Sequence, residues 1–159
     1  MFRTSEITGI RDLCAISDRL VTAGQPTPEQ FAALKAEGFE VVINLVPPTN
    51  PHFVGGEPEI VTALGLRYEG ISVDWAAPNR EELFRFFEVM QSCEDKKVFV
   101  HCAANKRVSV FVFLYRVLCL GTDETDAEDD LERVWVPEGA WRAFLSDSLH
   151  PVCGLLGKR

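Results

Sequence analysis

The sequence predicts a three-layer α/β fold in which a mostly parallel sheet of four or five strands lies between helices. Segments with the composition of strands alternate with segments that carry helical caps and helical periodicity, which is typical of this class. The 159 residues match the length of one domain, about 100–200 residues, and 47% of them are apolar, enough to build a core. Because no linker or internal repeat interrupts the pattern, we expect a single domain over residues 1–159.

Runs of strand length are expected to form the sheet at residues 19–23, 41–46, 66–73 and 97–101. The first helix begins at Thr27, whose hydroxyl can accept an amide proton while Gln30 reaches back, and it ends at Gly38. Asn79 caps another helix in the same way. Further helices are expected over residues 57–64, 108–120, 125–134 and 138–149. The one over 108–120 is apolar on nearly all sides, so it should lie inside the molecule.

Much of the acidity is confined to one segment. The chain carries 24 acids and 16 bases, a net charge of −8, and seven of the acids lie in residues 122–132. This run is either a solvated helix start, since Thr125 and Glu128 form a capping pattern and acids suit a helix N-terminus, or a surface for a partner. No basic stripe is present, so a nucleic-acid partner is not expected.

The rest of the composition favours a reduced, cytoplasmic protein. No run approaches the ~20 apolar residues of a membrane span, and no secretory signal is expected in the first 17 residues. The five cysteines are irregularly spaced without a C-x-x-C pair, so we predict neither a disulfide framework nor a metal site, and no cofactor. We expect four of these cysteines to be buried and inert, namely Cys14, Cys93, Cys119 and Cys153.

One strand–loop–helix segment is the candidate for chemistry. Cys102 stands at the carboxyl end of strand 97–101, and ligands bind at that edge of open α/β sheets. Loop amides and the start of the following helix favour an anion and the thiolate form of a cysteine. Lys106 and Arg107 add positive charge, and Asn105 tolerates a left-handed turn. The alternative is a buried, inert Cys102.

His101-Cys102, the later Ser109 and this strand–loop–helix setting resemble the active-site loop of the protein tyrosine and dual-specificity phosphatases. The resemblance extends to a bacterial branch of phosphatase-like proteins, which contain a segment similar to residues 22–30, TAGQPTPEQ. The order of elements agrees with that family over roughly residues 10–150. The resemblance implies the three-layer fold of the cysteine-dependent phosphatases.

The loop departs from that family's pattern, in which five residues separate the cysteine from an arginine followed by a hydroxyl residue. Here four residues separate Cys102 from Arg107. Aligned without a gap, Val108 takes the arginine's place and Ser109 keeps the hydroxyl position; aligned with a deletion, Arg107 is the arginine and Val108 follows it. We favour the ungapped alignment for the helix, with Arg107 reaching the anion from one residue earlier. The phosphate is expected against Ala103, Ala104, Asn105, Lys106, Arg107 and Val108.

The resemblance implies hydrolysis of a phosphomonoester, on a phosphorylated protein or a small phosphorylated substrate. Cys102 would attack phosphorus and form a cysteinyl-phosphate that water hydrolyses, while Arg107 holds the phosphate. His101 would tune the cysteine and Ser109 would assist the departing thiolate; a structural strand end and a helix-start hydroxyl are the plainer interpretations. Asp74, after the third strand, is by position the general acid or an ordinary turn residue.

Three further side chains near these segments have plain interpretations. Trp75 is expected to pack half-buried, with a wall beside a phosphorylated ring as the alternative. His52 and His150 belong to no recognisable pattern, and we expect them at the surface or in packing contacts.

Two rival functions stay open at this point. The four-residue spacing is closer to the loop of the rhodanese-like sulfurtransferases, which hold a cysteine persulfide. That family's upstream Asp-x-Arg strand is missing here, however, and a histidine directly before the cysteine is a phosphatase trait. Val108 at the arginine's position instead favours a module that binds phosphate without turning it over.

Overall fold

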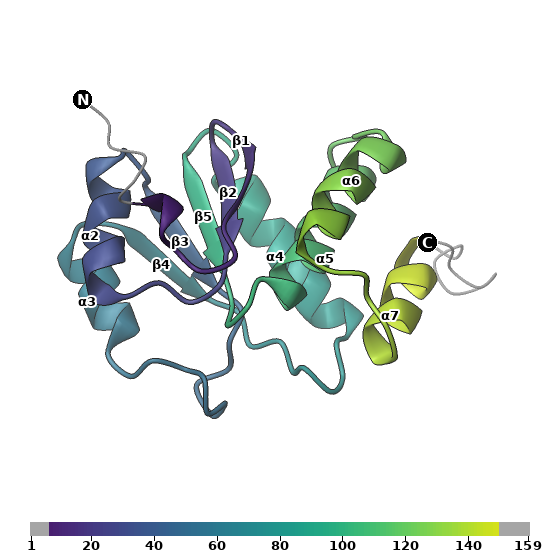
Figure 1. Cartoon of the computed structure of the whole chain (residues 1–159), viewed down its shortest axis with the longest axis horizontal. Helices are drawn as coiled ribbons and strands as arrows, with labels where there is room; N and C mark the ends of the chain where they lie inside the picture. The colour runs from purple at the N-terminus through teal and green to yellow at the C-terminus, as the bar shows by residue number, and fades with distance from the viewer. Residues whose placement is uncertain (1–6, 150–159) are drawn as a thin grey trace.

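A computed structural model describes residues 7–149, in which five strands form one sheet in the order β1-β2-β5-β3-β4 (Figure 1). Its parallel pairings are as follows: β2 (Leu20–Ala23) is parallel to β5 (Val98–His101), β5 to β3 (Val41–Asn44), and β3 to β4 (Arg67–Gly70). Strand β1 (Cys14–Ser17) pairs antiparallel with β2 at one edge. The predicted, mostly parallel sheet of four or five strands is confirmed.

Helices cover both faces of this sheet (Figure 1). Helices α2 (Pro28–Ala36) and α3 (Glu57–Ala63) lie on one face, and the other face carries α4 (Arg80–Ser92), α5 (Lys106–Leu118), α6 (Glu124–Val134) and α7 (Ala140–Leu149). Successive strand residues point to opposite faces. Val42 therefore belongs to the core under α2 and α3, whereas Ile43 belongs to the core under α5. The predicted three layers are confirmed.

The predicted helix caps are right at α2 and α4 and wrong at α6. Thr27 Oγ1 accepts the Gln30 amide at 3.2 Å, and Gln30 Oε1 accepts the Thr27 amide at 2.9 Å. Asn79 caps α4 as expected. At α6, Thr125 lies inside the first turn, and Asp123 is the cap because its carboxylate accepts two amides of that turn.

Strand β1 was not predicted, and the other strands are shorter than their apolar runs. An edge strand needs no continuous apolar sequence, since only part of it is covered, and β1 alternates between buried and more exposed residues. Strand β3 ends at Asn44 and β4 at Gly70, where the chain leaves the ladder although apolar residues continue. Within residues 7–149, no helix is long and apolar enough to cross a membrane.

The central position of β5 determines where the candidate cysteine lies. Strand β5 is flanked by β2 and β3, and Cys102 follows its last residue at the carboxyl edge of the sheet. The chain then enters α5, whose residues from Arg107 to Tyr115 are all buried. The prediction of an interior helix after the loop is therefore confirmed.

Candidate active site

A tight loop of three residues joins Cys102 to helix α5. Asn105 caps that helix in the left-handed conformation, with φ of 65°, as its residue type predicts. Its side-chain amide donates to the Asp12 carbonyl at 2.9 Å and to Thr22 Oγ1 at 3.0 Å. Asn105 therefore fastens the loop to the strand beside it, and its expected contact with the phosphate stays a prediction.

Gly24 lets the segment after β2 approach this loop closely. The Gln25 amide donates to the Ala103 carbonyl at 3.1 Å, and Gly24 forms an isolated bridge with Ala104. A Cβ atom at Gly24 would lie 2.6 Å from the Ala103 carbonyl oxygen and 3.2 Å from the Ala104 Cα. The glycine of the TAGQP segment is therefore required by contact with the cysteine loop.

Substituting Gly24→Ala is expected to destabilise the protein by about 1–3 kcal/mol, because the clash is with backbone that can relieve it only by moving the loop. Thermal unfolding measures this loss. Gly55→Ala is the matched control, since a Cβ there meets nothing within 4 Å. Equal melting temperatures for the two variants would show that the close approach is unimportant.

A cavity of about 360 Å³ opens beside the loop. Its lining from the loop and α5 consists of Cys102, Ala103, Ala104, Lys106 and Arg107, and the loops after β3 and β4 add Asn50, Pro51, His52 and Trp75. The residue Cys102 is only 1% exposed, yet it borders this cavity. Cys102 thus belongs to the buried apolar core and also borders the cavity.

Backbone amides are free where an anion would meet them. Within residues 7–149, the amides of Ala103 and Ala104 have no backbone acceptor, nor do those of Lys106 and Arg107 in the first turn of α5. Amides in a first helical turn lack an intrahelical partner, and they bind anions readily. The start of α5 therefore supplies donors beside the cavity.

Arg107 is the arginine that lines this cavity. Its side chain is 5% exposed, its Nε has no hydrogen-bond partner among the described residues, and its guanidinium carbon lies 5.8 Å from the centre of the Trp75 ring. Val108 is fully buried in the core instead. A buried guanidinium nitrogen without a partner is costly, and an oxyanion in the cavity would satisfy it.

Ser109 faces a different part of the molecule. Its hydroxyl donates to the Lys106 carbonyl at 3.0 Å and accepts from Trp135 Nε1 at 3.1 Å, and it borders a separate small cavity under α6. These contacts agree with the plainer interpretation of Ser109, a hydroxyl at the start of a helix. The catalytic assignment of Ser109 stays a prediction without a contact to the cavity.

The loop after β4 brings Trp75 to the cavity, and Asp74 next to it does not border the cavity. Asp74 Oδ1 accepts the Ala76 amide at 2.9 Å, which is an ordinary turn contact. Trp75 is 42% exposed and stacks on Trp141, with ring centres 5.5 Å apart. We expected Trp75 to be a packing residue, with a cavity wall as the alternative. Its side chain packs against Trp141, and the residue also borders the cavity.

Of the histidines without a pattern, His52 is exposed, as expected, but it also lines the cavity that Cys102 borders. No sequence signal pointed to this, because the long loop between β3 and α3 carries it there. His150 lies outside the described residues.

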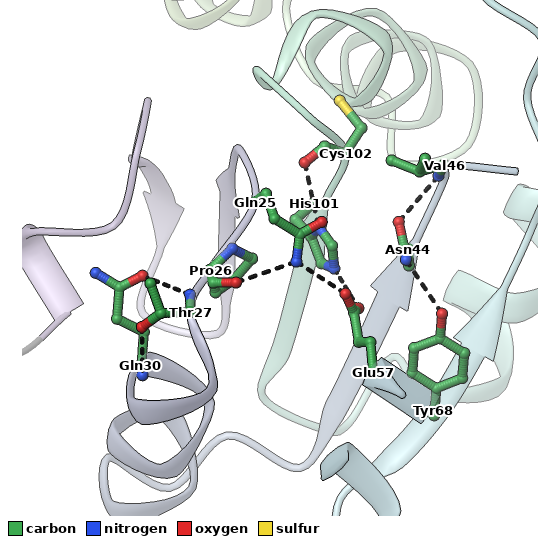
Figure 2. A network of polar contacts seen from close by, with 10 residues as sticks. All are labelled: Gln25, Pro26, Thr27, Gln30, Asn44, Val46, Glu57, Tyr68, His101 and Cys102. Carbon is green, nitrogen blue, oxygen red and sulfur yellow. Dashed lines mark hydrogen bonds and ion pairs between the residues drawn. The ribbon is translucent and has the colours of Figure 1, made fainter. Parts of the chain in front are cut away.

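Sequence reasoning missed Glu57, which contacts the predicted His101 directly. His101 Nε2 lies 2.6 Å from Glu57 Oε2, and both side chains are completely buried (Figure 2). Glu57 Oε1 accepts from Gln25 Nε2 at 2.8 Å. A glutamate opening a short helix 44 residues upstream has no local pattern that would pair it with the histidine.

The other described cysteines differ from Cys102. Burial raises the pKa of the thiols of Cys14, Cys93 and Cys119 above the usual value, which keeps them protonated near neutral pH. Cys14 and Cys93 are buried as expected, whereas Cys119 is half-buried, and Cys153 lies outside the described residues. None of the three lines the cavity beside Cys102.

With this geometry in hand, comparison with solved structures identifies the family. A crystal structure from Shewanella putrefaciens CN-32, described as "Putative phosphatase (DUF442)", matches with a TM-score of 0.82 and 32% identity over 92% of this chain and 96% of that one. The chain belongs to the DUF442 phosphatase-like family. The resemblance to bacterial phosphatase-like proteins and the implied fold are thereby confirmed.

Two further comparisons place this DUF442 chain among other proteins. It is 31% identical over 117 residues to a β-lactamase hydrolase-like protein of Agrobacterium fabrum, and it spans about a quarter of that protein's length, 27%. The structure of Tk-PTP in its active form shares the fold with a TM-score of 0.70 at 18% identity, over 89% of this chain and 98% of that one. A search against protein-family models finds no match.

Proposed function

We propose that this DUF442 protein hydrolyses phosphomonoesters through a covalent intermediate on Cys102. The observation that carries the proposal is a single cavity bordered by the cysteine, by the start of α5 and by Arg107. Among the described residues, the amides at the start of α5 have no backbone acceptor and Arg107 Nε has no hydrogen-bond partner. The Cys102 thiolate attacks phosphorus and the alcohol oxygen leaves with a proton from an acid. Water then attacks the cysteinyl-phosphate, releasing inorganic phosphate and restoring the thiolate.

The charges in the cavity suit this reaction. In the transition state of phosphoryl transfer, negative charge spreads over the equatorial oxygens of the phosphoryl group. Most of the catalysis is therefore positioning and electrostatic stabilisation. Arg107 is almost completely shielded from solvent beside Trp75. A guanidinium in such a place interacts with an anion more strongly than it would in water. Lys106 borders the same cavity but is exposed, so solvent screens its charge.

The proposed substrate is a phosphorylated protein or a small phosphorylated compound. Trp75 borders the cavity, where its ring packs against Trp141, Trp135 and the Arg107 guanidinium. TpbA of P. aeruginosa, which shares the fold at 16% identity with a TM-score of 0.60, was crystallised in complex with pTyr as a cysteine-to-serine variant. That complex favours an aryl phosphate as the first substrate to assay.

We propose Asp74 as the acid that protonates the leaving oxygen. His52 is the alternative proton donor against which this assignment is tested. Asp74 Oδ1 is engaged by the Ala76 amide, and its loop must shift to bring the other oxygen to the cavity that Trp75 already borders. Asp74→Asn is expected to slow hydrolysis about a hundredfold for a poor leaving group and little for a good one. Steady-state kinetics with both kinds of aryl phosphate measures this.

His52→Gln is the control, and it should leave both rates nearly unchanged. The reverse pattern, in which His52→Gln slows the poor leaving group and Asp74→Asn does not, would assign the proton to the histidine that the cavity already contains.

Sulfur transfer is the second candidate, favoured by the four-residue spacing between Cys102 and the cavity arginine. In that reaction thiosulfate gives its outer sulfur to the thiolate and leaves as sulfite, and cyanide then removes the sulfur as thiocyanate. The argument for a phosphate-binding module without turnover was that Val108 takes the place of the arginine. Arg107 borders the cavity and Val108 lies in the core, so this argument no longer applies.

Two assays on the same preparation separate these functions. We expect hydrolysis of an aryl phosphate by the wild-type protein and no formation of thiocyanate from thiosulfate and cyanide. Thiocyanate formation without phosphate release would replace the proposal with sulfur transfer. Binding of vanadate with neither reaction would leave a binding module.

A further inference from the structure

A buried chain of contacts leads from Gln25 through Glu57 and His101 to Cys102 (Figure 2). On the ring's other side, His101 Nδ1 lies 3.2 Å from the Cys102 carbonyl oxygen. In Figure 2 the sulfur of Cys102 points away from this chain, while its carbonyl oxygen points toward the imidazole. The contacts therefore reach the backbone of the cysteine and leave its thiol free for the cavity.

The partners of the imidazole determine where its protons lie. A carbonyl oxygen only accepts, so the contact to Cys102 requires a proton on His101 Nδ1. The second contact, between His101 Nε2 and Glu57 Oε2, holds one further proton, which belongs to the imidazole or to the carboxyl group. Either way the pair carries no net charge, as expected for two side chains that are both completely buried.

Gln25 fixes the remaining oxygen of the glutamate. Its side-chain amide donates to Glu57 Oε1, and its backbone amide donates to the Ala103 carbonyl in the cysteine loop. Besides its direct contacts, the TAGQP segment thus reaches the loop indirectly through Glu57 and His101. This is a structural use for a sequence segment that the proposed chemistry leaves unexplained.

We propose that Glu57 is a positioning residue that acts on Cys102 through His101. It keeps the Nδ1 proton directed at the Cys102 carbonyl, which fixes the first peptide of the loop so that the thiolate faces the donors of α5. The inference rests on the proposed role of Cys102 as the nucleophile, and it concerns the reactivity of that thiol rather than the substrate.

The wild-type protein provides the first test. Long-range proton–nitrogen correlation spectra of the histidine rings distinguish a protonated from an unprotonated ring nitrogen, and a His101→Asn spectrum assigns the signals. We expect a proton on His101 Nδ1 in the folded protein, because its partner is a carbonyl oxygen. An unprotonated Nδ1 overturns the inference, whether or not any variant folds.

The second test measures the alkylation of Cys102 by iodoacetamide, followed by mass spectrometry of the cysteine peptide. Glu57→Ala frees the ring and removes the constraint on Nδ1, and we expect it to slow alkylation roughly tenfold. Glu57→Gln should restore the rate to within about twofold, because the Gln amide can donate to Nε2 and accept from Gln25.

Glu59→Ala is the matched control, since it removes an exposed carboxylate from the same turn of α3 and should leave the rate unchanged. Unchanged alkylation in a folded Glu57→Ala protein overturns the inference. So does a Glu57→Gln protein as slow as Glu57→Ala, because the effect would then come from charge. Normal alkylation without phosphate release would defeat the proposed function and leave this inference standing.

Discussion

Substituting Cys102→Ser is expected to abolish the hydrolysis of aryl phosphates, with a loss of about four orders of magnitude or more. The serine hydroxyl is nearly isosteric but is not ionised near neutral pH, so the covalent step has no nucleophile. Because serine is nearly the same size as cysteine, the change should leave the fold and the cavity intact, although the side chain is almost completely buried at the end of the central strand. Phosphate release and thermal unfolding, measured together, check both parts.

Cys119→Ser is the matched control for this variant. Burial raises the pKa of the Cys119 thiol, and the residue ends α5 far along the chain from the loop. It should retain full activity. Loss of hydrolysis in the Cys119 variant, or its persistence in the Cys102 variant, would contradict the assignment of the nucleophile.

The second large effect is expected for Arg107→Ala, which should lower kcat about a hundredfold or more. The guanidinium borders the cavity, is 5% exposed and has an Nε without a partner among the described residues, so its charge is poorly screened. Losing it removes the donors that meet the phosphoryl oxygens in the transition state. Steady-state kinetics on a single aryl phosphate measures the change.

Two variants give this prediction its control. Lys106→Ala removes the neighbouring charge, but that side chain is exposed and lies over the Trp135 ring, so we expect a loss of only a few-fold. Arg107→Lys keeps a charge and loses the forked geometry, and its rate should fall between the other two. Equal losses for Lys106→Ala and Arg107→Ala would remove Arg107 from its assigned place.

The regular elements were predictable because each carries its own local signal. Examples are the capping box of Thr27 and Gln30 and the apolar periodicity of the later helices. These signals do not depend on contacts with distant parts of the chain. The edge strand β1 had no such signal, because half of its pairing faces solvent. The N-cap of α6 is Asp123 and not Thr125. The sequence could not decide between them, because the acidic run contains several residues able to cap a helix within one turn.

At the site, the sequence indicated the loop but not its surroundings. A strand that ends in His101-Cys102 and continues into an apolar helix predicts a cysteine at the sheet edge from local order alone. Spacing could not decide between Arg107 and Val108, since that depends on where α5 begins, and the helix starts at Lys106. Glu57 and His52 arrive from distant loops, and only tertiary contacts reveal them.

The most direct test of the account is a crystal structure with vanadate or tungstate, which mimic a phosphoryl group. The account predicts the metal oxyanion against Cys102 Sγ, with the amides at the start of α5 and the guanidinium of Arg107 both bonded to its oxygens. An anion bound elsewhere, or a cavity that stays empty while Arg107 keeps its place beside Trp75, would contradict it.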